Sequence, residues 1–459
     1  MADKVKNIEK PSELQRDLKN RHIQLISIGG VIGTGLFLGS GKSIAMAGPS
    51  ILLTYLIVGI FVFFIVRALG ELLMSNLKRK SFLDFVDHYL GHKTGFITGW
   101  TYWFAWVALG ATDLTATGMY MKFWAPDLPQ WLPEVVAILI LLAINLSAVK
   151  YFGEIEFWFA LIKVVAVIAL IIVGAIIIFA NIGNGTSDAS ITNLWQQGGF
   201  FTGGWSGFLL SFQIVTFAFV GVEVIGVIAG EAEKPERNIP KAINNVPLRV
   251  GIFYIGALLV IMCVHPWSVY KAGESPFVEV FSQAGVTIAA SIINFVVLTA
   301  AASACNSALY SSSRMLTSLS DQNNAPKAFS VLTRHGTPKY ALFTCAGVVF
   351  SVIILNIFVP SRAFDIASSL STICFVFVWC VIIITHMVYR KQTPKEKLGK
   401  FRMPLYPYSS YAIFVFIALV TVVMLFIVDT LIALIILPIF LVILYVAYHF
   451  YHRNKSIEK

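Results

Sequence analysis

The stretch that decides the fold is Gly29–Gly41, which reads GGVIGTGLFLGSG and is followed directly by Lys42 and Ser43. Its ending, GSGKS, is similar to a phosphate-binding loop, but that pattern needs glycine at the position of Leu36. The dinucleotide pattern GxGxxG also fails, because Leu38 stands where its third glycine belongs. Nucleotide binding is therefore not predicted, and the six glycines need another explanation.

The composition of the chain places this stretch in a membrane. Hydrophobic residues make up 57% of the 459 residues and charged residues 13%, with a mean hydropathy of +0.79. Soluble domains carry about 25% charged residues, so this chain could not cover itself with a polar surface in water. The five cysteines form no CxxC pair, and the histidines have no metal-ligand spacing. We therefore expect an integral membrane protein with reduced cysteines and no metal or other cofactor.

Apolar stretches of about 20 residues, the length that crosses a bilayer, recur along the chain. Because no alternating β-barrel pattern is present, only helices can satisfy the backbone in lipid, and we predict an all-α membrane protein. Twelve spans are predicted, over residues 23–42, 48–75, 95–121, 131–149, 155–180, 205–229, 247–266, 284–314, 340–359, 364–389, 410–428 and 431–450. The loops leave no room for a soluble catalytic domain, and no nucleophile–base set appears, so an enzyme is not predicted.

The distribution of basic residues predicts the orientation. If the N-terminus lies in the cytoplasm, 28 of the 34 Lys and Arg residues fall in cytoplasmic tails and loops and 3 in outer loops. This bias agrees with the positive-inside rule and places both termini in the cytoplasm. It also explains the net charge of +10 through contact with anionic lipid headgroups, so no nucleic-acid partner is expected.

Glycines weaken the middle of the first span. Each glycine costs a helix interior about 1 kcal/mol relative to alanine, so the pairs Gly29-Gly30 and Gly33-Thr34-Gly35 favour an interruption. Close helix packing through small residues is the alternative. In an interrupted helix, free backbone amides could bind an anionic group such as a carboxylate. A repeated fold would contain a second interrupted helix, and Gly221 with Glu223 in the sixth span indicates one.

Charged residues inside the spans are costly and mark candidate functional sites. Lys163 lies about two turns inside the fifth span and either carries a proton or snorkels to the interface. Glu223 either braces unwound backbone, which we prefer, attracts a substrate amine or carries a proton. Arg67 and Glu71, one turn apart, are expected to form a structural ion pair. Asp113 either lines a cavity or caps a kink.

The hydroxyls of the eighth span and an aromatic run add further candidates. Most of the serines are expected to bond neighbouring helices, while Ser307 and Ser311 are candidates to face Lys163 and the first helix. In the run GWTYWFAWV the aromatic side chains mostly pack, with Trp103 or Trp106 as a candidate pocket wall.

Several segments together resemble the bacterial amino acid permeases of the amino acid–polyamine–organocation superfamily. They run from Leu18 to about Tyr389 and read NRHIQLISIGGVIGTGLFLGSG, AGPSILL, RALGELL, FGEIEFWFALIKVVAV, FAFVGVEVIG, EKPERNIPKAIN and SRML. Within the family, GWTYWF, PFVEVF, NFVVLTAAASACNS and FWAPDLPQW look most like the D-serine, D-alanine and glycine permeases. Permeases for proline and other neutral amino acids share most of this frame.

The resemblance implies a five-plus-five inverted repeat over residues 23–390, with helices one and six broken. Two further helices with their preceding loop would occupy 391–451, between cytoplasmic tails at 1–22 and 452–459. The substrate would lie between the two breaks. Its carboxylate would lie at Val31, Thr34 and Gly35, and its amino group at Phe217, Ala218 and Val220. The ring of Phe217 or Phe219 would close over it. Lys163 matches the lysine that replaces sodium in proton-coupled relatives, and Glu223 is the second candidate proton-coupling residue.

The function that follows is proton-coupled import of small neutral amino acids, such as glycine, D-alanine and D-serine, across a bacterial plasma membrane. Two alternatives remain from the sequence. The chain could be an exchanger or a permease for another neutral amino acid such as proline, or it could be a sensor that binds an amino acid without moving it. The sequence predicts no oligomeric state.

Overall fold

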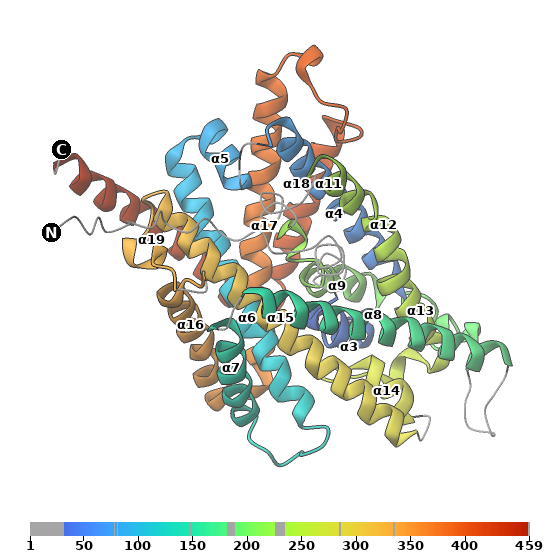
Figure 1. The fold of residues 1–459 in the computed structure, drawn as a ribbon. Helices are drawn as coiled ribbons and strands as arrows, with labels where there is room; N and C mark the ends of the chain where they lie inside the picture. Colours follow the sequence, from blue (N-terminus) through green and yellow to red (C-terminus); the bar gives the residue numbers. More distant parts are fainter. Residues whose placement is uncertain are drawn as a thin grey trace.

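The computed structural model describes residues 32–77, 79, 81–146, 149–180, 189–224, 235–283, 286–333 and 336–457 (Figure 1). Within these ranges, all regular secondary structure is helical. Eight helical stretches are long and apolar enough to cross a membrane, and two shorter apolar helices, Trp131–Leu146 and Tyr408–Met424, accompany them. The prediction of an all-helical membrane protein is therefore confirmed. The count of twelve spans and the inverted repeat stay predictions.

The first span begins, in the described part of the chain, as extended backbone at Gly33. Helix α2 (Thr34–Phe37) starts there and leads, after Leu38, into α3 (Gly39–Ala47). A single 3-10 turn, η1 (Gly48–Ser50), connects α3 to the long helix α4 (Ile51–Ser75). A helix therefore begins at Thr34 within the glycine-rich stretch, while residues 23–31 of this span lie outside the described ranges.

The sixth span is interrupted in its middle. Helix α9 (Gly204–Phe217) ends halfway along the predicted span 205–229. A turn follows in which Gly221 has φ +88°, a conformation that glycine adopts without steric cost. The short 3-10 helix η3 (Val222–Val224) comes next, and residues 225–234 lie outside the described ranges. The glycine that indicated an interruption thus occupies the turn itself.

The remaining helices follow the other predicted spans to within several residues. Those between the two interruptions are α5 (Phe82–Leu90), α6 (His92–Met121), α7 (Trp131–Leu146), α8 (Val149–Ala180) and η2 (Ile191–Leu194). Those after the second are α11 (Pro235–Asn244), α12 (Val246–Arg249), η4 (Val250–Gly256), α13 (Ala257–Val264), η5 (Trp267–Val269), α14 (Pro276–Gln283), α15 (Thr287–Asp321), η6 (Lys327–Ser330), α16 (Lys339–Phe358), α17 (Pro360–Gln392), η7 (Lys395–Lys397), α18 (Tyr408–Met424) and α19 (Val428–Ile457). The sequence does not predict α5, α11 or α14, since none of them is long enough to give a span signal.

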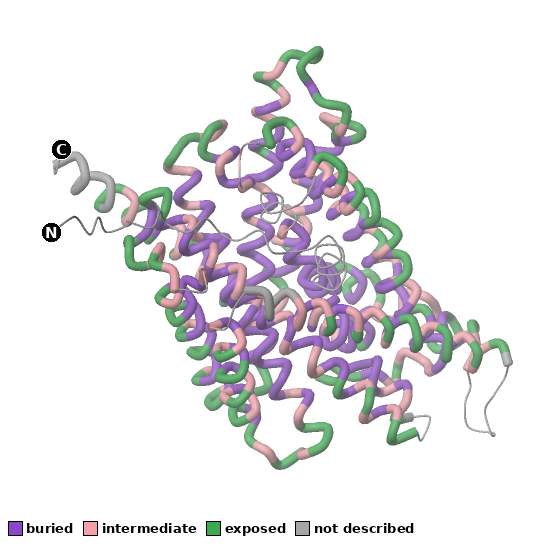
Figure 2. Tube along the Cα trace, viewed as in Figure 1, coloured by how far each residue is buried: buried purple, intermediate pink, exposed green. Residues whose placement is uncertain are grey.

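Helix α6 runs through the middle of the bundle, where it packs against α15 and α17, and α3 lies beside α9 (Figure 1). Buried residues line the inner faces of the helices and exposed residues the periphery (Figure 2). Helix α8 shows this division clearly, because Trp158, Val165, Ile172 and Phe179 recur every seven residues and are all exposed. Since these side chains are apolar, we assign this face of α8 to lipid and the opposite face to the interior.

Candidate functional site

The start of α2 and the end of α9 meet in the interior. A Cβ atom at Gly35 would lie 2.5 Å from the Cα of Ala218 and 3.0 Å from its amide nitrogen. No side chain fits at that distance, so only glycine lets the start of α2 and the end of α9 approach this closely. Thr34, Ala218 and Val220 are all buried. The residues implied to hold a substrate carboxylate and amine are therefore neighbours, while Val31 lies outside the described residues.

The two phenylalanines of the sixth span contact different neighbours. The ring of Phe217 meets Phe364 of α17 edge-on, with centroids 6.0 Å apart. The ring of Phe219 stacks on Tyr254 at 4.8 Å, and the hydroxyl of Tyr254 donates to the carbonyl of Ala218 at 3.0 Å. The ring of Phe219 is thus packed against Tyr254, and the carbonyl of Ala218 already accepts a hydrogen bond from the same residue. Phe217 is the better placed of the two rings to close over a substrate.

A buried charged cluster lies beside the first interruption. The hydroxyl of Thr34 donates to Asp113 of α6 at 2.6 Å, and that of Ser303 of α15 donates to Glu156 of α8 at 2.6 Å. Lys163, also on α8, interacts electrostatically with both carboxylates. All three charged side chains are 1% exposed. The snorkelling interpretation of Lys163 is therefore wrong, because its ammonium group lies inside the bundle.

Each of the two carboxylates in this cluster has one oxygen atom that accepts no hydrogen bond from the described residues. Asp113 Oδ2 and Glu156 Oε2 are buried and have no hydrogen-bond partner among the described residues. Glu156 is a member of the site that the sequence reading missed. Its position seven residues before Lys163, two turns along one helix face, is the signal that could have identified it.

Glu223 is held by its surroundings in the sixth span. The indole nitrogen of Trp379 on α17 donates to Glu223 Oε2 at 3.0 Å, and the buried Oε1 has no hydrogen-bond partner among the described residues. The side chain is completely buried. Trp379 therefore holds this carboxylate next to the turn at Gly221, and the bracing interpretation stays a prediction.

Helix eight contributes to the charged cluster through Ser303 rather than through the two predicted serines. Ser307 and Ser311 are half-buried and one turn apart on α15. Ser312 and Ser313 donate to carbonyl oxygens of their own helix, as serines in membrane helices often do.

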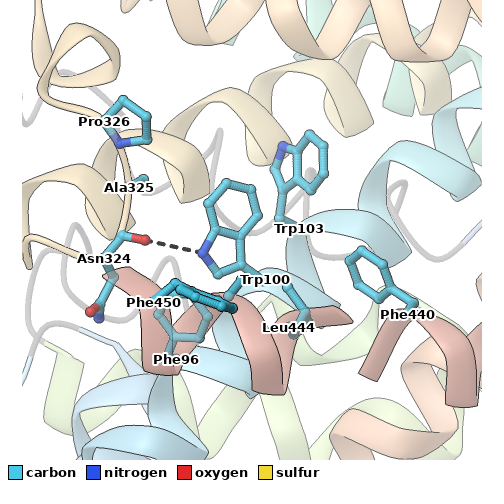
Figure 3. A pocket seen from close by; sticks show the side chains of 10 residues that line it. Phe96, Trp100, Trp103, Asn324, Ala325, Pro326, Phe440, Leu444 and Phe450 are labelled. Atoms are coloured by element: carbon cyan, nitrogen blue, oxygen red, sulfur yellow. Dashed lines mark hydrogen bonds between the residues drawn. The ribbon is translucent and has the colours of Figure 1, made fainter. Parts of the chain in front are cut away.

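The structure distinguishes the two candidate tryptophans. The indole nitrogen of Trp103 donates to the sulfur of Cys345 at 3.3 Å, and the ring lines a pocket near the start of α6 (Figure 3). Trp106 instead lies 3.6 Å from the Cβ position at Gly221. Trp106 is therefore the tryptophan next to the interruption, and Trp103 belongs to another site.

An ion pair joins α3 to α17 next to Phe217. Lys42 Nζ lies 2.8 Å from Asp365 Oδ2, and both side chains are about one-fifth exposed. The preceding residue, Phe364, contacts Phe217. One turn of α17 thus touches both interrupted helices.

Among the described residues, no group of three or more His, Cys, Asp or Glu side chains could hold a metal ion.

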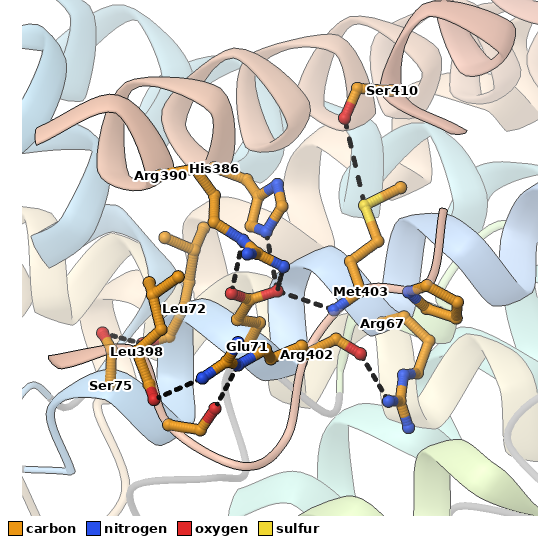
Figure 4. A network of polar contacts seen from close by, with 12 residues as sticks. Arg67, Glu71, Leu72, Ser75, His386, Arg390, Leu398, Arg402, Met403 and Ser410 are labelled. Carbon is orange, nitrogen blue, oxygen red and sulfur yellow. Dashed lines mark hydrogen bonds and ion pairs between the residues drawn. The ribbon is translucent and has the colours of Figure 1, made fainter. Parts of the chain in front are cut away.

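Glu71 belongs to a buried polar network and does not form the predicted ion pair with Arg67 (Figure 4). Its carboxylate forms an ion pair with Arg390, with Nε and Oε1 2.7 Å apart. It accepts hydrogen bonds from Arg390 Nη2 at 3.1 Å, from His386 at 3.0 Å and from the backbone amide of Met403 at 2.6 Å. Arg67 points elsewhere, since its guanidinium donates to the side chain of Asn244 and to a carbonyl of the loop before α18. The predicted Arg67–Glu71 pair is therefore wrong, because tertiary partners replace the neighbour on the same helix.

Comparisons with known proteins match nearly the whole chain. The sequence pattern of the family described as "Amino acid permease" matches residues 22–459. An uncharacterized transporter of Bacillus subtilis, YdgF, is 56% identical over 412 residues, 90% of each chain. The amino-acid permease AapA of the same organism is 55% identical over 406 residues, 88% of each chain. The D-serine/D-alanine/glycine transporter of Escherichia coli (strain K12) is 49% identical over 415 residues, 88% of each chain.

Proposed function

Because the chain belongs to the amino acid permease family, we propose that it is a proton-coupled symporter that imports small neutral amino acids, such as glycine, D-alanine and D-serine, across the plasma membrane. The observation that carries this proposal is the contact between two interrupted helices beside a buried lysine and two buried carboxylates. Backbone at an interruption offers groups for an amino acid's main chain, and the charged cluster offers a place for a proton.

The backbone groups at the interruptions suit the two charges of an amino acid. The first amides of a helix lack acceptors within the helix, so those of Thr34 and Gly35 are free to bind the carboxylate. The carbonyl of Val220 is the first proposed acceptor for the ammonium group. The carbonyl of Phe217, which already accepts from the Val220 amide at 3.2 Å, is the second. The Ala218 carbonyl contributes less than the sequence implied, because Tyr254 already donates to it.

The close contact at Gly35 supports a small substrate. With less than the space of one methyl group between Gly35 and Ala218, the α-carbon of a substrate must lie to one side of this contact. Phe217, supported by Phe364, would limit the pocket further. A relative that is 49% identical is described as a transporter of D-serine, D-alanine and glycine, which are all small.

The charged cluster accounts for proton coupling by simple charge balance. Ionised Asp113 and Glu156 with protonated Lys163 carry a net charge of −1, so one added proton makes the cluster neutral. A neutral cluster is much easier to hold in the apolar interior of a membrane than a charged one. The free oxygen of Asp113 is the proposed site of that proton. Since Asp113 also holds Thr34, protonation and substrate binding would act on the same helix start.

Uptake of labelled glycine into proteoliposomes tests the proposal. We expect accumulation that depends on an inward proton gradient, does not require sodium, and is reduced by D-alanine and D-serine but not by L-phenylalanine. Lys163→Ala should abolish gradient-driven accumulation while the protein still binds glycine. Normal accumulation in this variant would refute the role of the lysine.

The same assay tests the alternatives. Counterflow of internal and external glycine without any response to a proton gradient would identify an exchanger. Saturable binding without accumulation or counterflow would identify a sensor. Strong competition by L-proline alone would assign the chain to another substrate among the neutral amino acids.

A further inference from the structure

A pocket of about 580 Å³ lies apart from the interruptions, between the first turns of α6, the last turns of α19 and the segment that follows α15 (Figure 3). Its lining residues are Phe96, Trp100, Trp103, Asn324, Ala325, Pro326, Phe440, Leu444, Ala447 and Phe450. Five of these ten are aromatic, and the wall is almost entirely apolar. An open apolar pocket of this kind suits a hydrocarbon chain rather than an amino acid.

The shape of the pocket follows from the helices that form it. Its lining residues on α19 extend from Phe440 to Phe450, roughly 15 Å along the helix axis at 1.5 Å per residue. Those on α6 occupy successive turns close to its start at His92. The charge distribution assigns this end of α6 to the cytoplasm, so the pocket runs from the inner interface into the membrane. Tryptophans such as Trp100 are typical of that depth.

One polar group in the pocket lacks a partner. Asn324 is 4% exposed, and its side-chain Oδ1 has no hydrogen-bond donor among the described residues. The backbone carbonyl of the same residue accepts from the indole nitrogen of Trp100 at 3.1 Å, which holds the segment against α6 (Figure 3). This hydrogen bond fixes the position of the segment after α15, which forms one wall of the pocket.

Positive charge stands at the rim of the pocket. Lys327 follows Pro326 directly and is exposed. Lys93 lies one turn before Phe96, and its ammonium group sits 3.6 Å from the ring centroid of Tyr445 on α19. The nearby carboxylate of Asp87 is already paired with His92 at 2.8 Å. The two lysines therefore favour an anionic group at the mouth of an otherwise apolar pocket.

We propose that this pocket binds an anionic phospholipid of the inner leaflet. An acyl chain lies along the aromatic wall, and the phosphate faces Lys327 and Lys93. The bound lipid fills the gap between α19 and α6, the helix that also carries Asp113. This inference does not depend on the identity of the transported amino acid.

Native mass spectrometry of the purified full-length protein tests the inference, with phosphatidylglycerol or phosphatidylcholine added in equal amounts. We expect retention of phosphatidylglycerol to exceed that of phosphatidylcholine by about tenfold or more, as two lysines near an anionic headgroup imply. Ala447→Trp, which fills the pocket, and Lys327→Glu should each remove this preference. The matched controls, Ala412→Trp on the exposed face of α18 and Lys339→Glu at the start of α16, should retain it.

Three results would overturn the inference. Equal retention of the two lipids by the wild-type protein would show that Lys327 and Lys93 do not favour an anionic headgroup over a zwitterionic one. Unchanged preference in both pocket variants would place the lipid elsewhere. A dimer that Ala447→Trp dissociates, or a lipid preference that changes on removal of residues 2–20, would assign the pocket to a second copy or to the chain's own N-terminal segment. Thermal unfolding of each variant checks that loss of lipid is not loss of the fold.

Discussion

A single hydrogen bond, from Thr34 to Asp113, connects the start of α2 to α6 and to the charge of Lys163. Its donor belongs to the glycine-rich stretch that the sequence singles out, and its acceptor lies 79 residues away. Sequence reasoning identified Lys163 because a lysine within an apolar run is conspicuous. It could not pair Asp113 with Thr34, because no spacing rule relates residues on different helices.

Asp113→Asn should uncouple transport from the proton gradient. The amide can still accept from Thr34, but the cluster becomes neutral without an added proton. A pH difference of about one unit supplies about 1.4 kcal/mol per proton, enough for roughly tenfold accumulation by the wild-type protein. We expect none in the variant, with glycine counterflow retained. Asp127→Asn, at an exposed position in the loop after α6, is the control, and an unchanged gradient response in Asp113→Asn contradicts the proposal.

Gly35→Ala should weaken substrate binding and destabilise the protein. The new methyl group would lie 2.5 Å from the Cα of Ala218, and backbone cannot yield as cheaply as a side chain. Overpacking of this kind typically costs about 1–3 kcal/mol. Gly33→Ala is a matched control, because the nearest atom to its Cβ position is 3.9 Å away. Titration calorimetry with glycine provides the comparison, and equal affinities of the two variants would count against the site.

At the scale of the elements, the interrupted sixth span is stabilised by a helix that follows it much later in the chain. Gly221 provides the turn and Glu223 follows it in η3, and both features could be read from the sequence. The partner, Trp379 on α17, could not, since it lies 156 residues away. Helix α17 also contacts Phe217 through Phe364, so it supports both sides of the interruption.

Trp379→Phe should lower stability more than Glu223→Gln. The phenylalanine removes the donor and leaves a buried carboxylate short of one hydrogen bond, at a cost of about 1.5–3 kcal/mol. Glutamine keeps an acceptor for the indole. Thermal unfolding of the purified proteins measures the order, with Trp205→Phe as a control because Trp205 is 70% exposed. The reverse order would contradict the bracing role of Glu223.

At the scale of the whole molecule, Glu71 ties together parts of the chain that are far apart in sequence. It joins α4 to α17 through His386 and Arg390, and to the loop before α18 through the amide of Met403 (Figure 4). Arg67 stacks on Phe401 of the same loop at 3.8 Å. The loop before α18 is therefore held against α4 by these contacts. In this way they connect the last two helices to the rest of the bundle.

Glu71→Ala should release this loop. Removal of one partner from a buried ion pair costs about 3–5 kcal/mol, because the remaining charges are left without compensation. We expect a lower unfolding temperature and faster amide hydrogen exchange over residues 398–407 by mass spectrometry. Asp87→Ala removes an exposed pair with His92, which is worth at most about 1 kcal/mol, and serves as the control. Equal effects of the two variants would show that the Glu71 network is not structural.

The sequence by itself determined the helical membrane class, the approximate limits of most helices and the interruption of the sixth span. These properties are local, since hydropathy over about 20 residues and the helix-weakening effect of glycine depend only on neighbouring residues. The interruption of the first span stays a prediction, because residues 23–31 lie outside the described ranges. Only the tertiary structure decided which side chains meet. It brought Gly35 against Ala218, Thr34 to Asp113, and Glu71 to Arg390 instead of to Arg67. Such pairs join residues on separate helices, and their contact depends on how the helices pack, which no period in the sequence records.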